Sequence, residues 1–84
     1  MMYNMGERLG VTMLTFELES YENGRYTYIY YPEDNKEAPG RVVLFKDENR
    51  EIIEDSKDDV KGYYRGHALW GIPVGEKSGT VAWC

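Results

Sequence analysis

The dipeptide Asn23-Gly24 lies between two runs of alternating residues and constrains the fold more than any other feature of this sequence. Asparagine and glycine tolerate the positive φ angles that a two-residue type I′ turn needs at both central positions. The pattern therefore predicts a β-hairpin over residues 14–31, with Glu22 opposite Arg25. The same register pairs Ser20 with Thr27, Leu18 with Ile29 and Phe16 with Tyr31.

Side chains alternate between the two faces of a strand, so this register gives the hairpin one apolar face and one polar, aromatic face. The apolar face carries Leu14, Phe16, Leu18, Ile29 and Tyr31. The other face carries Glu17, Glu19, Tyr21, Tyr26, Tyr28 and Tyr30. Tyrosine is enriched at protein interfaces, so these six residues are the predicted partner-binding face. One alternative is that the tyrosines only stabilise the sheet through cross-strand contacts. A second is that this face, and not the face with Phe16 and Leu18, receives part of the helix.

The segments that follow predict further strands. A polar connection over residues 32–40, with proline near each end, precedes two short apolar runs over residues 41–46 and 51–54. A turn between these runs would place Phe45 near Ile52 and Leu44 near Ile53. The first run is apolar on both faces, which is typical of a central strand. Residues 79–84 form a last strand pattern.

A four-residue spacing predicts one helix from about Asp58 to Gly71, with Val60, Tyr64, Ala68 and Ile72 on its apolar side. Residues 56–59 offer N-cap side chains, and Pro73 ends the helix. Glycines at 62, 66 and 71 disfavour a helix, so packing against the sheet must hold it. We expect Gly62 and Gly66 to face the sheet, and Val81 and Trp83 to lie under the helix.

These segments predict a single α+β domain over residues 13–84. It consists of an antiparallel sheet of four or five strands, in the order β-β-β-β-α-β, with one helix packed on one face. Residues 1–12 have no clear period and are predicted to form a flexible arm. Met13 directly precedes the first strand and is a candidate natural start beside Met1. The alternative is that Leu9 and Val11 lengthen the first strand.

The charge balance bears on the class of partner. Fifteen acidic and ten basic residues give a formal net charge of −5, and the basic residues are scattered. Direct binding to nucleic acid is therefore disfavoured. An acidic protein can instead imitate nucleic acid and inhibit a DNA-binding protein, which is one alternative function. The single cysteine, Cys84, and the lack of a long apolar run predict a cytoplasmic protein that does not enter a membrane.

His67 is the only histidine and the main candidate for catalysis. It could act as a general base in a small enzyme, which is a second alternative, but the sequence supplies no obvious nucleophile within its reach. Cys84 could pair with it only if the terminus folds back. The acidic residues around 54–59 are typical of a solvated helix start, and one histidine with one cysteine cannot bind zinc. We therefore predict no catalytic residue, no metal site and no cofactor.

Two short segments carry a resemblance. Residues 64–68, Tyr-Arg-Gly-His-Ala, followed by residues 79–83, Gly-Thr-Val-Ala-Trp, resemble the ending of small uncharacterised proteins of low-GC Gram-positive bacteria and their mobile elements. The resemblance implies a bacterial accessory protein and carries no activity with it. The resulting prediction is a noncatalytic accessory or protein-protein interaction protein. Its partner would be another protein or a second copy in a homodimer.

Overall fold

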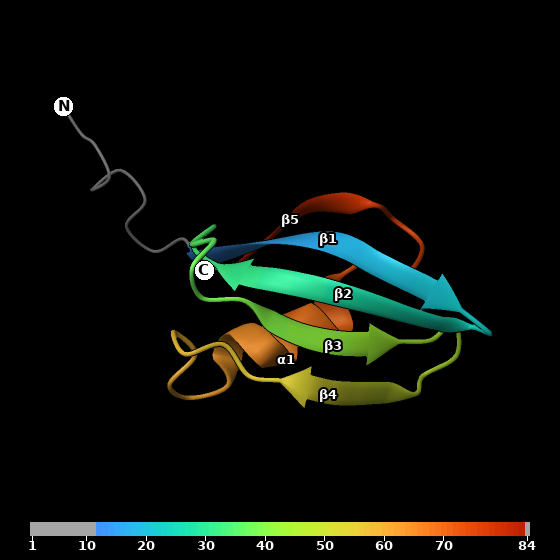
Figure 1. Ribbon diagram of the computed structural model, residues 1–84. Helices are drawn as coiled ribbons and strands as arrows, with labels where there is room; N and C mark the ends of the chain where they lie inside the picture. Colours follow the sequence, from blue (N-terminus) through green and yellow to red (C-terminus); the bar gives the residue numbers. More distant parts are fainter. Residues whose placement is uncertain (1–11, 84) are drawn as a thin grey trace, which may run out of the picture.

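The computed structural model describes residues 12–83, which form a five-stranded antiparallel sheet with one helix on one face (Figure 1). The strands are β1 (Thr12–Glu22), β2 (Arg25–Pro32), β3 (Gly40–Leu44), β4 (Arg50–Glu54) and β5 (Ser78–Trp83), and the helix is α1 (Tyr63–Gly71). The order across the sheet is β4-β3-β2-β1-β5. The predicted α+β fold is therefore confirmed, while residues 1–11 of the predicted arm lie outside the described residues, as does Cys84.

The hairpin between β1 and β2 turns at the predicted dipeptide. Asn23 and Gly24 have φ angles of 53° and 83°, as a type I′ turn requires. The predicted register holds from the turn as far as the pair Ser20 and Thr27. A β-bulge at Glu19 then adds one residue to β1. The register beyond this point differs from the prediction.

The bulge reverses the facing of the two strands relative to one another. Tyr28 lies opposite Leu18, and Tyr30 lies opposite Phe16, so both tyrosines share the core side of the sheet. Both side chains are 0% exposed. The prediction that Ile29 lies on the core side is wrong, because one extra residue reverses the alternation of every pair beyond it.

α1 covers one face of the sheet and closes the core (Figure 1). The buried cluster consists of Leu14, Phe16, Tyr28, Tyr30, Val42, Leu44, Ala68 and Ile72. Val81 and Trp83, which were predicted to be buried under the helix, are only partly buried, and both pack against this cluster. β5 thereby joins the C-terminal end of the chain to β1 and to α1 at once.

α1 begins at Tyr63, so the predicted start at Asp58 is wrong. Gly62, at the N-cap, has a φ of 81°, a left-handed conformation that a continuous helix cannot contain. Val60, predicted on the apolar side, is 88% exposed. The four-residue spacing was misleading because no packing holds the segment before Gly62 in a helix.

A side chain from the preceding loop caps α1. The carboxylate of Asp59 accepts hydrogen bonds from the backbone N–H groups of Tyr64, at 3.1 Å, and Arg65, at 2.8 Å. This satisfies two of the N–H groups that have no partner within a helix, and it places negative charge at the positive end of the helix dipole. The predicted capping segment thus caps the helix without belonging to it.

β3 is a central strand with both faces buried, as predicted. Val42, Val43 and Leu44 are all 0% exposed. β3 pairs with β4 as predicted, but the predicted register is wrong, because Ile52 lies opposite Val42 and not near Phe45. β4 is an edge strand and is mostly exposed.

Candidate functional site

The predicted partner-binding residues fall on both faces of the sheet. Glu17 and Glu19 lie on the face away from α1, here called the outer sheet face. The other four lie on the α1 side: Tyr21, Tyr26, Tyr28 and Tyr30. Two of these, at positions 28 and 30, are fully buried, so the six residues do not form one accessible surface. The two nearer the hairpin tip have ring centroids 4.5 Å apart, and Tyr21 is 58% exposed.

Tyr28 and Tyr30 have structural roles. The Tyr28 hydroxyl donates to the carbonyl oxygen of Glu76 at 2.7 Å and accepts from the N–H of Gly75 at 2.9 Å. It therefore anchors the loop between α1 and β5. The ring of Tyr30 lies against Gly40, where a Cβ atom would be 2.3 Å from Cζ of the ring. Burial raises the pKa of Tyr30 to about 12.

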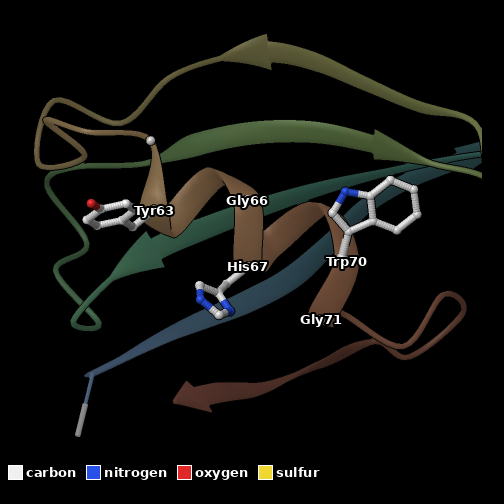
Figure 2. A pocket seen from close by; sticks show the side chains of 6 residues that line it. Tyr63, Gly66, His67, Trp70 and Gly71 are labelled. Carbon is white, nitrogen blue, oxygen red and sulfur yellow. The ribbon is translucent and has the colours of Figure 1, made fainter. Parts of the chain in front are cut away.

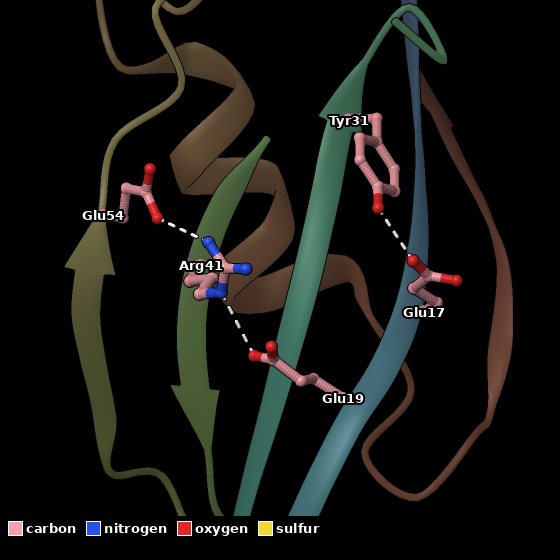
Figure 3. Close-up of polar contacts among 5 residues, drawn as sticks. All are labelled: Glu17, Glu19, Tyr31, Arg41 and Glu54. Atoms are coloured by element: carbon pink, nitrogen blue, oxygen red, sulfur yellow. Dashed lines mark hydrogen bonds and ion pairs between the residues drawn. The ribbon is translucent and has the colours of Figure 1, made fainter. Parts of the chain in front are cut away.

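Arg41 organises the outer sheet face (Figure 3). Its guanidinium donates to Glu54 on the neighbouring strand β4 at 2.6 Å. It also donates to Glu19 on β1 at 3.1 Å, and this contact crosses β2. These two carboxylates raise the pKa of Arg41. The bulged residue Glu19 thus has a visible function in the fold, because it supplies one of the two partners.

A second polar contact on this face joins β2 to β1. The Tyr31 hydroxyl donates to a carboxylate oxygen of Glu17 at 2.7 Å, and this hydrogen bond raises the pKa of Tyr31 (Figure 3). Toward the hairpin tip, the two Nη atoms of Arg25 make a bidentate contact with the two carboxylate oxygens of Glu51, each at 3.1 Å. Much of the charge on the outer sheet face is therefore used within the sheet.

A different surface lies on the solvent side of α1 (Figure 2). It has a hollow of about 390 Å³, lined by Gly62, Tyr63, Gly66, His67, Trp70 and Gly71, and we call these six residues the α1 surface. Tyr63 is 65% exposed and Trp70 is 63% exposed. They lie toward opposite ends of the helix, with His67 between them (Figure 2).

Trp70 is held from one side. The guanidinium carbon of Arg50 lies 4.5 Å from the centroid of the Trp70 ring, a cation–π contact. Arg50 is itself fixed, because its Nε donates to the carbonyl oxygen of Leu69 at 2.7 Å. The indole is thus positioned against the protein while most of its area faces solvent.

His67, the candidate catalytic residue, packs against an aromatic ring. Its imidazole lies parallel to the indole of Trp83, with centroids 3.7 Å apart and an interplanar angle of 10°. The carboxylate of Asp55 pairs with Arg65, and that of Asp59 caps α1. Within residues 12–83, no group of three or more His, Cys, Asp or Glu side chains is arranged to hold a metal ion.

Tyr63 and Trp70 were not among the predicted partner-binding residues, although the sequence contains a signal for them. Tyr63, Gly66, His67 and Trp70 follow the spacing i, i+3, i+4, i+7, which marks one face of a helix. The competing stripe, with Tyr64, Ala68 and Ile72, turned out to face the core.

No family model, curated protein or solved structure matches this chain. The described part of the chain contains no helix with the length and hydrophobicity needed to cross a membrane.

Proposed function

We propose that this chain is a noncatalytic protein-protein interaction protein that binds its partner through the α1 surface. The observation that supports this proposal is the pair of exposed aromatic side chains, Tyr63 and Trp70, on either side of a hollow on one helix face. The leading function is the one predicted from the sequence. Its site, however, moves from the first hairpin to the helix.

Three properties of the α1 surface fit a binding role. Tryptophan and tyrosine are the side chains that most often dominate the energy of protein interfaces. Trp70 is already positioned by Arg50, so less conformational entropy is lost when a partner covers it. The hollow between the two rings offers space for a partner's side chain, and its lining contains no carboxylate.

Affinity capture from cells that make the protein tests this role. The full-length chain serves as bait, and Trp70→Ser is compared with Tyr21→Ser, a matched control that also shortens an exposed aromatic side chain but lies at the hairpin tip. We expect partners to be captured by the wild type and by the control, and to be lost with Trp70→Ser. Equal capture by all three baits would contradict the assignment of the α1 surface.

The resemblance to small bacterial proteins supports a role as a bacterial accessory protein, and the single cysteine supports a reducing, cytoplasmic location. Fractionation of the producing cells would test the location, and recovery of the protein outside the cytoplasmic fraction would contradict it.

A second candidate function is that of an acidic nucleic-acid mimic. It is favoured by the outer sheet face, which among the described residues carries the carboxylates of Glu17, Glu19, Glu51 and Glu54. The cations of Arg25, Arg41 and Lys36 lie on the same face, the last over the Tyr31 ring. A complex with a basic DNA-binding protein should dissociate steeply as salt rises, whereas contacts at the aromatic α1 surface should resist salt. Elution of captured partners in steps of increasing salt distinguishes the two functions.

A further inference from the structure

Gly66 is the one glycine of the described residues that the fold itself does not explain. At Gly40, Gly71 and Gly79, a Cβ atom would lie closer than 3 Å to a neighbouring side chain. Three more glycines have positive φ angles: Gly24, Gly62 and Gly75. At Gly66, apart from the adjoining residues and the backbone of α1 itself, no atom lies within 4 Å of the position that a Cβ would take. The expectation that Gly66 lets α1 approach the sheet is therefore wrong.

A glycine inside a helix lowers stability, so its presence at an open position calls for a reason outside the monomer. Glycine lets another backbone come closer than any other residue does. Gly66 lies at the centre of the α1 surface, between Tyr63 and Trp70. The feature at this position is thus a notch in the helix surface with an aromatic side chain on each side.

We propose that a second copy of this chain occupies the α1 surface, so that two α1 helices pack antiparallel across a two-fold axis near Gly66. This inference rests on the proposed function and names its partner. Tyr63 precedes Gly66 by three residues and Trp70 follows it by four, which places the two rings about 10 Å apart along the helix axis with the notch midway. A two-fold axis at the notch therefore lays each Trp70 on the partner's Tyr63 end.

Charge supports the same arrangement. The lining of the α1 surface carries no carboxylate, although the chain has a net charge of −5, so two copies can meet here without opposing acids. Arg50 lies at the Trp70 end of α1, and Asp59 lies at the other end. An antiparallel pair brings each Arg50 toward the partner's Asp59 and also opposes the two helix dipoles.

The size of the surface favours a weak, transient dimer over a permanent one. A fully buried tyrosine or tryptophan contributes about 150–250 Å², so the four exposed rings of two copies supply on the order of 500 Å². Stable specific interfaces bury about 1,200–2,000 Å² in total. The flanking residues of both chains must supply the remainder, and we expect a reversible dimer with a dissociation constant on the order of tens of micromolar.

Sedimentation velocity of the full-length chain from 5 to 500 μM, a range set to bracket about that dissociation constant, tests the proposal. We expect the wild type and the Tyr21→Ser control to dimerise alike, and Trp70→Ser to weaken dimerisation at least about tenfold. Gly66→Gln should fill the notch and weaken dimerisation about fivefold or more, while its urea unfolding midpoint stays at or above that of the wild type. Lost association in a variant that is no less stable cannot be attributed to unfolding.

The possible outcomes separate the second copy from the proposed function. A wild-type chain that stays monomeric over the whole range, or a dimer that neither substitution weakens, overturns the proposal. If the chain is monomeric but capture of another protein still depends on Trp70, the second copy is excluded and the proposed function remains. If neither is seen, both fail.

Discussion

Tyr28 and Tyr30 lie on the same strand and are both fully buried, but their hydroxyl groups differ in their hydrogen bonds. Tyr28→Phe removes the hydrogen bonds to Glu76 and Gly75, and we expect it to lower the free energy of unfolding by about 1–2 kcal/mol. The Tyr30 hydroxyl is buried and makes no hydrogen bond of standard geometry among the described residues, so Tyr30→Phe should raise the free energy of unfolding by up to about 1 kcal/mol. Urea unfolding followed by circular dichroism measures both changes.

Each substitution keeps the ring and its packing, so each serves as the control for the other. Equal losses in the two variants would show that the Tyr30 hydroxyl makes a hydrogen bond in solution, and the difference in roles would then be rejected.

These two residues also show why the predicted partner-binding face could not be correct. On β1, glutamates at 17 and 19 mark the outer side, and the hydrophobic pattern is clear. On β2, Ile29 and Tyr31 are as apolar as Tyr28 and Tyr30, so neither register leaves a polar residue in the core. A single bulge then decides which pair is buried, and nothing in the pattern locates that bulge.

At the scale of the helix, Gly62 and Gly66 lie one turn apart and should respond to alanine with opposite signs. Gly62 has a φ of 81°, and a Cβ there would lie 2.8 Å from Nη2 of Arg65. We expect Gly62→Ala to lower the free energy of unfolding by about 1–2 kcal/mol. Gly66→Ala adds a methyl group into open space and should raise it by about 0.5–1 kcal/mol.

Thermal and urea unfolding at a protein concentration of a few micromolar, well below the dissociation constant of tens of micromolar expected from the interface size, isolate these effects in the monomer. A loss of stability in Gly66→Ala would mean that this position is packed within the chain, which would also remove the main support for the notch.

The elements themselves were predictable where local chemistry specifies them. Asn23-Gly24 predicted the first turn, and Pro73 predicted the end of the helix. The apolar run over residues 41–46 predicted the central strand β3. The start of α1 was not predictable from spacing, because Gly62 takes a left-handed conformation that the sequence only permits. The α1 surface was missed for a related reason: two stripes of the helix are apolar, and only the packing of α1 against the sheet shows which one remains exposed.

At the scale of the whole molecule, three tyrosines link stability to alkaline pH. The pKa of each of these tyrosines is raised above its ordinary value. The largest cause is burial for Tyr28 and Tyr30, and the hydrogen bond to Glu17 for Tyr31. A raised folded pKa means that the folded chain keeps a proton that the unfolded chain gives up. The stabilisation is therefore complete below about pH 10 and is lost as the pH rises through the folded pKa.

We expect the free energy of unfolding to change little from the tyrosines up to about pH 9 and then to fall between about pH 10 and 12. Because the pKa of Tyr30 rises from 10.0 to about 12, its share of the loss is on the order of 2–3 kcal/mol, a large part of the stability of so small a domain. Urea unfolding at a series of pH values measures the fall, and Tyr30→Phe isolates the share of this residue because lysine ionisation is common to both chains. The variant's stability should decline less steeply above pH 10, and parallel declines in the two chains would contradict the link between Tyr30 burial and alkaline unfolding.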